Sequence, residues 1–132
     1  MIWQASFSLA PVAKGRARIG KFGAYTPAKT RKAEGELRYF ISQNSPVFFD
    51  GPIDLSIRFI ITRPASISAK KRPHPTTRPD LDNYIKTVLD ASNGLLWKDD
   101  AQIVRLVAEK VYGTSPSIEI TVKSFEALAC LA

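Results

Sequence analysis

The chain has 132 residues, of which 45% are hydrophobic and 23% charged, and its formal net charge is +7. This length suits one domain with its own core, and the composition excludes a disordered chain, a collagen-like fibre and a disulfide scaffold. Cys130 is the only cysteine, so the chain forms no internal disulfide. No apolar run approaches the roughly 20 residues that span a bilayer, and the first residues lack the basic segment of a signal peptide. We therefore expect a soluble, cytoplasmic protein.

The basic charge is concentrated in the first part of the chain. Residues 1–40 have a net charge of +6 and residues 41–77 of +3, whereas residues 78–132 have a net charge of −2. A basic surface is typical of a protein that binds a polyanion, because each Lys or Arg near a phosphate releases condensed counterions. The alternative is that the basic charge serves solubility alone.

The first half of the chain predicts two strands and one helix. Alternating apolar and polar side chains predict strands over residues 3–9 and 53–61. Residues 11–26 predict an extended basic loop, since their glycines disfavour a helix. The helix is predicted from Thr26 to about residue 43, with Thr26 as N-cap and Pro27 at the first helical position.

The second half predicts one helix and two further strands. Three prolines between residues 64 and 78 predict an open loop, and a helix is predicted from Asp80 to about residue 93, with Gly94 just past its end. Residues 102–112 fit a strand or a helix; their β-branched content and the turn at 113–116 favour a strand in a hairpin with residues 117–122. Residues 125–132 form a short helix in this interpretation. We expect one α+β domain over residues 1–132, with a mixed or antiparallel sheet of about four strands packed with two main helices.

Acidic side chains gather in the basic chain at one predicted helix and the turn after it. Asp80 and Asp82 stand two residues apart at the start of the helix, and Lys86 and Asp90 follow Asp82 at i+4 and i+8, roughly along one face. Residues 99–100 are a second acidic pair, on the turn that leaves the helix. Three or four carboxylates can therefore converge, and carboxylate oxygens are hard ligands that suit Mg²⁺ or Mn²⁺.

This pattern predicts metal-assisted phosphodiester hydrolysis, with a structural alternative for each residue. Metal ions held by carboxylates lower the pKa of bound water and neutralise the phosphate, and a neighbouring lysine stabilises developing charge. Alternatively, Asp80 is only a helix-end charge, Asp82 and Lys86 form an exposed i,i+4 pair, and residues 99–100 are a polar turn. A zinc site is not indicated, since His74 and Cys130 are each the only residue of their type.

Residues 78–103 resemble the signature of the RusA-type Holliday-junction resolvases. The family pattern is P-D-x-D-N, a lysine four residues on, D-A, and then W-x-D-D-x-Q-[IV], and every element is present. The sequence PVAKGRAR at residues 11–18 and AYTP at residues 24–27 are similar to the family's basic loop and helix start. The resemblance implies a small α+β homodimer that binds four-way DNA junctions and, with Mg²⁺ or Mn²⁺, nicks two opposing strands symmetrically in recombination and repair. Such proteins are often encoded by phages or prophages.

The resemblance also implies roles for individual residues. Its catalytic and metal-binding acids fall on Asp80, Asp82 and Asp100, and its essential lysine on Lys86. Supporting or structural roles fall on Asp90, Asp99 and Trp97. The basic side chains of the two loops are expected to contact DNA phosphates, or else to be merely solvated. These residues are Lys14, Arg16, Arg18, Lys21, Lys70, Lys71, Arg72 and Arg78.

Two other functions stay open at the level of sequence. One is a nucleic-acid-binding module without catalysis, in which the acids are structural. The other is a structure-selective nuclease that cuts flaps or forks. A dimer has a physical rationale, because a four-way junction is approximately two-fold symmetric and a C2 dimer presents two identical sites at a fixed separation.

Overall fold

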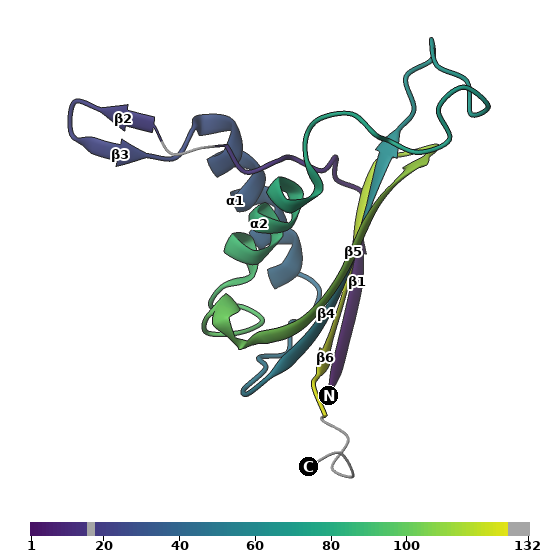
Figure 1. The fold of residues 1–132 in the computed structure, drawn as a ribbon. Helices are drawn as coiled ribbons and strands as arrows, with labels where there is room; N and C mark the ends of the chain where they lie inside the picture. The colour runs from purple at the N-terminus through teal and green to yellow at the C-terminus, as the bar shows by residue number, and fades with distance from the viewer. Residues whose placement is uncertain (16–17, 127–132) are drawn as a thin grey trace.

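The protein is an α+β fold in which two helices pack on one face of a four-stranded sheet (Figure 1). The computed structural model describes residues 1–15 and 18–126, without the side chain of Arg18. The elements in chain order are β1 (Ile2–Phe7), β2 (Arg18–Gly20), β3 (Gly23–Tyr25), α1 (Ala28–Ser42), β4 (Ile53–Thr62), α2 (Leu81–Ser92), a 3₁₀ turn η1 (Asp100–Gln102), β5 (Ile103–Gly113) and β6 (Ser117–Ser124). The helix predicted for residues 125–132 lies outside the described residues from 127 onwards.

The main sheet has the strand order β1-β6-β4-β5 and is mixed. The pairs β1–β6 and β6–β4 are antiparallel, whereas β4 and β5 run parallel. The predicted strands over 3–9 and 53–61 are confirmed as β1 and β4, and the predicted class, a mixed four-stranded sheet with two main helices, is confirmed with them.

The strand over residues 102–112 is confirmed as β5, but the hairpin predicted between it and residues 117–122 is wrong. β4 lies between β5 and β6 and pairs with both. Alternation reports which face of a sheet a side chain occupies, not which strand lies next to it. The chain crosses the end of β4 closely at Gly113, where a Cβ atom would lie 2.5 Å from Cγ2 of Ile60.

The hydrophobic core lies between the helices and the inner face of the sheet. Leu55, Ile57 and Phe59 of β4 are 3% exposed or less, because a central strand is covered by its neighbours and by the helices. Most of the rest of the core comes from β1, α1, α2 and β6. Its residues include Trp3, Phe7, Leu37, Ile41, Tyr84, Val88, Ala91, Ile118, Ile120 and Val122.

Two details of the chain between β1 and α1 differ from the prediction. The N-cap of α1 is Pro27, with no side-chain cap hydrogen bond, so the N-cap predicted at Thr26 is wrong by one residue. The extended loop predicted for 11–26 contains the short antiparallel hairpin β2–β3. Strands of three residues are too short to show a period of two, which is why the sequence pattern misses them. The hairpin projects from the body of the protein beside the start of α1 (Figure 1).

The open loop predicted for residues 64–78 is confirmed, and it is fastened at its base. The guanidinium of Arg63 donates to the carbonyl oxygens of Ser68, Arg72 and Pro73, and it lies 4.3 Å from the ring centroid of Tyr112. The loop forms the second projection of the molecule (Figure 1).

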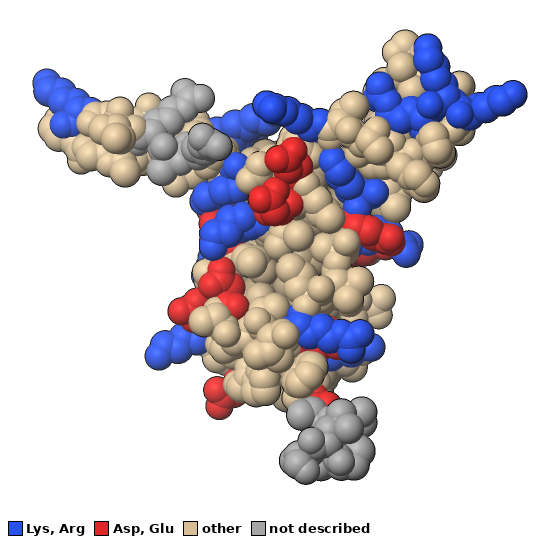
Figure 2. Space-filling view, in the orientation of Figure 1, with Lys and Arg blue, Asp and Glu red and all other residues tan. Residues whose placement is uncertain are grey.

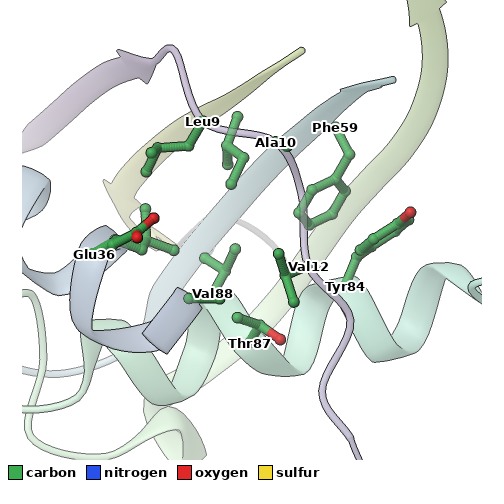
Figure 3. A pocket seen from close by; sticks show the side chains of 11 residues that line it. Leu9, Ala10, Val12, Glu36, Phe59, Tyr84, Thr87 and Val88 are labelled. Carbon is green, nitrogen blue, oxygen red and sulfur yellow. The ribbon is translucent and has the colours of Figure 1, made fainter. Parts of the chain in front are cut away.

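A small cavity of about 30 Å³ lies beneath the chain that follows β1 (Figure 3). Its lining is mainly apolar, with Leu9, Val12, Phe59 and Val88 among the residues that enclose it. It has room for about one water molecule, so it is a packing defect and not a candidate active site. Among the described residues, none of the helices combines the length and the apolar character needed to cross a membrane.

Candidate active site

Helix α2 presents the candidate catalytic side chains because its other face is buried. Tyr84, Val88 and Ala91 follow the i, i+4, i+7 spacing of an apolar stripe and pack into the core. The ring of Tyr84 stacks on Phe59 of β4 at 5.3 Å between centroids, which ties the first turns of the helix to the sheet. The polar face that carries residues 82, 86 and 90 therefore points away from the core.

The first turn of α2 carries two exposed carboxylates, as the sequence predicts. Asp80 is the N-cap, with extended backbone, but its side chain makes no capping hydrogen bond. Asp82 lies one residue inside the helix. Among the described residues, neither carboxylate has an ion pair or a side-chain hydrogen bond. Lys110 of β5 fixes the chain that leads into this turn, since its Nζ donates to the carbonyl oxygens of Thr77 and Pro79 at 2.8 and 2.9 Å.

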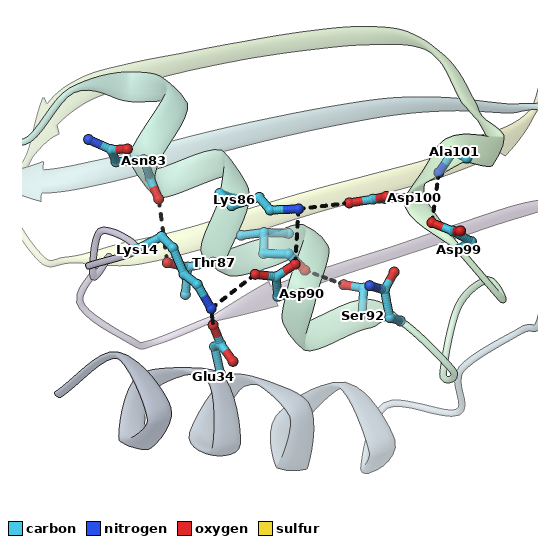
Figure 4. Close-up of polar contacts among 12 residues, drawn as sticks. Lys14, Glu34, Asn83, Lys86, Thr87, Asp90, Ser92, Asp99, Asp100 and Ala101 are labelled. Atoms are coloured by element: carbon cyan, nitrogen blue, oxygen red, sulfur yellow. Dashed lines mark hydrogen bonds and ion pairs between the residues drawn. The ribbon is translucent and has the colours of Figure 1, made fainter. Parts of the chain in front are cut away.

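The middle of α2 carries a chain of alternating charges (Figure 4). Nζ of Lys86 lies 3.1 Å from Oδ2 of Asp100 and 3.2 Å from Oδ1 of Asp90. The other oxygen of Asp90, Oδ2, lies 3.1 Å from Nζ of Lys14, and Lys14 also pairs with Glu34 of α1. The structure thus brings Lys86 and Asp100 together, and the i,i+4 pair of Lys86 is with Asp90 and not with Asp82.

Both lysines of this network are held as cations. The hydrogen bond to Asp100, with a further one to Asp90, raises the pKa of Lys86 against the opposing effect of burial. Burial lowers the pKa of Lys14, but its hydrogen bonds to Glu34 and Asp90 outweigh that effect, so the pKa is raised. Each ammonium group therefore stays protonated at neutral pH, and Lys86 offers a positive charge instead of a proton-accepting amine.

Lys14 reaches Asp90 because the chain after β1 is hydrogen-bonded to both helices. The backbone N–H of Lys14 donates to the carbonyl of Asn83 in α2 at 2.8 Å, and that of Gly15 donates to Oγ1 of Thr30 in α1 at 2.9 Å. The DNA contact predicted for Lys14 stays a prediction. Its ammonium group forms ion pairs with two carboxylates of the protein, those of Glu34 and Asp90.

The two acids of the turn after α2 have different surroundings. Asp99 is the N-cap of η1, and its Oδ1 accepts the backbone N–H of Ala101 at 3.1 Å. This N–H lowers the pKa of Asp99, helped by the side chain of Asp100. Asp99 therefore shapes the turn, whereas Asp100 faces Lys86.

Gln102 and Trp97 hold this turn in place. Oε1 of Gln102 accepts the N–H groups of Lys98 and Asp99, and its Nε2 donates to the carbonyls of Phe49 and Gly51, each at 3.0 Å. Trp97 is fully buried, and its Nε1 donates to Oδ1 of Asn93 at 2.8 Å. The indole packs inside the protein, in keeping with the structural role expected of it.

The donor set fits Mg²⁺ in kind but is not gathered as a metal site in the described part of the chain. Asp80, Asp82 and Asp100 supply carboxylate oxygens, the ligands that hard divalent cations prefer. No three acidic, histidine or cysteine side chains among the described residues lie close enough to hold one metal ion. The carboxylate of Asp100 instead faces the ammonium of Lys86.

The start of α2, which carries Asp80 and Asp82, lies between two projections with basic side chains (Figure 2). Lys and Arg atoms cover parts of both, and Asp and Glu atoms lie in the saddle between them, where α2 begins (Figures 1 and 2).

The basic residues predicted to contact DNA differ in their exposure. Lys21 is exposed on the β2–β3 hairpin, and Lys70 and Lys71 are exposed on the loop after β4. Arg72 is partly buried beside the hydroxyl of Tyr112, 3.4 Å away. Arg78 lines a surface hollow with Asp80, while Arg16 and the side chain of Arg18 lie outside the described residues.

Comparison with known proteins decides the family. The family model described as "Endodeoxyribonuclease RusA" matches residues 8–123, which include the whole of the site and most of the fold. The chain belongs to the RusA endodeoxyribonuclease family. The resemblance drawn from residues 78–103 is thereby confirmed.

Two relatives of this RusA-family chain differ in what their names say. A Bacillus subtilis (strain 168) protein named "Uncharacterized protein YqaN" is 34% identical over an alignment of 131 residues, which covers 89% of this chain and 92% of that protein. A protein of Lactococcus phage r1t named "Crossover junction endodeoxyribonuclease rusA" is 40% identical over an alignment of 74 residues, which covers 54% of this chain and 53% of the phage protein.

The sequence interpretation missed the supporting roles of three residues in this RusA-family site. Lys14 pairs with Asp90, and Glu34 pairs with Lys14; no local spacing signals contacts made between three separate segments. Gln102 stands in the W-x-D-D-x-Q pattern, and its position three residues after Asp99 is the spacing of a capping box.

Proposed function

We propose that the chain is a Mg²⁺-dependent crossover junction endodeoxyribonuclease that resolves four-way DNA junctions by paired, symmetric nicks in recombination and repair. The observation that carries the proposal is the acidic start of α2 in the saddle between two basic projections, together with the ion pair between protonated Lys86 of the same helix and Asp100. Family membership and the name of the phage relative support the reaction and the substrate class.

The basic and acidic residues have different roles in this proposal. Basic side chains of the two projections hold the DNA backbone and position it without reading sequence. The ammonium of Lys86 stabilises negative charge that develops on the phosphate during attack. Asp90 holds Lys86 through one carboxylate oxygen, and the hydrogen bond of its other oxygen to Lys14 keeps Asp90 itself in place.

We propose Asp80, Asp82 and Asp100 as the Mg²⁺ ligands. A bound Mg²⁺ would neutralise phosphate charge and lower the pKa of a bound water. The two first-turn carboxylates have no protein partner among the described residues, which favours a ligand from outside the chain. Asp100 joins this set only if Lys86 releases it or shares it, since the two side chains are paired.

We further propose that the active form is a homodimer. Resolution requires two cuts at symmetric positions, and a closed C2 dimer supplies two identical sites at a fixed separation. One copy of the site described above makes one nick.

The test is cleavage of a labelled four-way junction beside a linear duplex of the same sequence, with Mg²⁺, with Mn²⁺ and with EDTA. The proposal expects paired, symmetric nicks in the junction that need the metal. Equal cutting of both substrates would reduce the protein to a general nuclease. Binding without cutting would make it a DNA-binding module, and selective cutting of a flap or fork would change the substrate.

A further inference from the structure

The β2–β3 hairpin, residues 18–25, is an arm with an apolar tip. Its turn runs through Lys21 and Phe22, between Gly20 and Gly23. The arm extends away from the body of the protein (Figure 1), and no hydrogen bond or ion pair among the described residues joins it to the body. An isolated two-stranded hairpin adds little to folding stability, so a contribution to the stability of the core does not explain why the chain forms this arm.

The most exposed apolar side chains of the protein lie on this arm. Phe22 is 97% exposed and Ile19 is 90% exposed, more than any other large apolar residue described. Single exposed apolar residues are ordinary, but two of them nearly bare on one projecting hairpin are typical of a binding surface.

The arm is shaped to present Phe22 at its end. Gly23 has φ +108°, which allows the tight turn, and a Cβ atom at Gly20 would lie 2.9 Å from the Tyr25 ring. The ring of Tyr25 therefore lies across the strand at Gly20 and braces the hairpin on that side. The ammonium of Lys21 lies 5.9 Å from the ring centroid of Phe22, so a positive charge accompanies the aromatic tip.

The charge of the segment around the arm favours a nucleic-acid partner. The chain has no acidic residue before Glu34, whereas residues 14–32 contain seven Lys and Arg residues. This run of basic side chains attracts a polyanion such as a nucleic acid. The arm also stands on one side of the saddle that holds the α2 carboxylates, with the basic loop after β4 on the other side (Figure 2).

We propose that Phe22 stacks on a base exposed at the branch point of the DNA and so selects branched DNA over duplex. This inference rests on the proposed function. In a duplex each base face is covered by its neighbours, whereas a branch point interrupts the stack and uncovers base faces. Stacking of an aromatic side chain on a base tolerates any sequence, because every base has a π-face. Phe22 thus provides recognition of shape, and Lys21 beside it provides affinity for the backbone.

The experiment measures affinity for a four-way junction and for a matched duplex in Ca²⁺ or EDTA, so that no cutting intervenes. Phe22→Ala is expected to weaken junction binding about tenfold and to leave duplex binding within about twofold. Lys21→Ala is expected to weaken both, because a phosphate contact carries no preference for shape. Phe48→Ala is the matched control: Phe48 is 52% exposed, on the connection after the other end of α1, and its loss is expected to change neither affinity.

A second variant reports on stacking directly. Phe22→Trp places an exposed indole at the tip, whereas Trp3 and Trp97 are buried. Its fluorescence is expected to be quenched by the junction and much less by the duplex.

Several outcomes would overturn the inference. Equal loss of junction and duplex binding in Phe22→Ala, or unchanged junction binding, would do so while leaving the proposed cleavage intact. A change of oligomeric state in Phe22→Ala, seen by analytical ultracentrifugation without a change in DNA affinity, would assign the arm to a second copy. If the wild-type protein bound the junction selectively but never cut it, the proposed function would fail and the arm's role would stand. If it bound both DNAs equally, junction selectivity and this inference would fail together.

Discussion

The first turn of α2 and its middle turns carry the same kind of side chain in opposite circumstances. Asp80 and Asp82 are exposed, and neither has a protein partner among the described residues. Asp90, two turns later, is held between Lys14 and Lys86 through its two oxygens. A carboxylate that the protein leaves without a partner is available to a ligand, whereas one held between two cations serves the architecture of the site.

The comparison predicts that changes in these two regions of the helix separate activity from stability. Substitution in the first turn is expected to cost cleavage and leave the fold intact. Substitution in the paired region is expected to cost stability and to affect cleavage only through the position of Lys86.

The largest effect is expected for Asp82→Asn. We expect junction cleavage to fall on the order of 10²–10³-fold, because a charged oxygen ligand is lost. The thermal unfolding midpoint is expected to stay unchanged, because Asp82 has no partner among the described residues to lose. DNA binding is expected to stay the same or to strengthen, because a negative charge near the phosphate is removed. Single-turnover cleavage and equilibrium binding check this. Cleavage at the wild-type rate would show that Asp82 is not a metal ligand.

The next effect concerns Lys86, which connects the paired region to Asp100. Lys86→Met is expected to lower the cleavage rate by about 100-fold, whereas Lys86→Arg is expected to keep the rate within about tenfold of wild type, because arginine keeps the positive charge. A lysine that acted as a base would lose its function completely in the arginine variant. Cleavage rates of the two variants under single-turnover conditions therefore distinguish a cation from a base.

A smaller effect on cleavage is expected for Asp90→Asn, which weakens two ion pairs at once. We expect a loss of about 1–2 kcal/mol in the free energy of unfolding, together with a cleavage rate roughly tenfold lower as Lys86 loses one of its two anchors. Denaturant unfolding and cleavage assays measure the two quantities. A variant with normal stability and abolished cleavage would indicate that Asp90, like Asp82, acts in cleavage directly and not by supporting the fold.

The smallest effect is expected for Glu34→Gln, at the far end of the network. It removes one charge from the Lys14 pair, so we expect a loss of less than about 1 kcal/mol in the free energy of unfolding and no change in cleavage. Glu36→Gln is the matched control, because Glu36 lies on the same helix and makes only a 3.9 Å pair with Lys32. Thermal melts of the two variants side by side give the comparison, and identical melts would mean that the Lys14–Glu34 pair contributes nothing measurable.

Local patterns predicted most of the elements and failed where distant segments meet. The strand β4 and the helix α2 have long, regular periods, and both are found close to their predicted bounds. The hairpin of residues 102–122 failed because a good turn at 113–116 says nothing about a third strand that inserts between its arms. The three-residue strands of the β2–β3 arm are below the length at which a period exists.

The candidate site was predictable in part for the same reason. The i+4 spacing of Lys86 and Asp90 predicted a shared helix face, and the two residues form a pair there. The contact of Lys86 with Asp100 depends on how the chain turns after Trp97. The contact of Asp90 with Lys14 depends on a segment about 75 residues earlier in the chain. Both contacts belong to the tertiary structure and have no signature in the local sequence. The choice of Asp100 over Asp99 rests on the resemblance and stays a prediction; in the structure Asp99 caps η1, whereas Asp100 faces Lys86.

The position of β4 between β5 and β6 also determines how the protein folds. Ile57 of β4 pairs with Ala108 on one side and with Ile120 on the other. The sheet therefore closes only when segments about 50 to 60 residues apart in the chain meet, and such non-local pairing slows folding. During synthesis β4 therefore stays unpaired until β5 has emerged, and its second edge stays open until β6 has emerged.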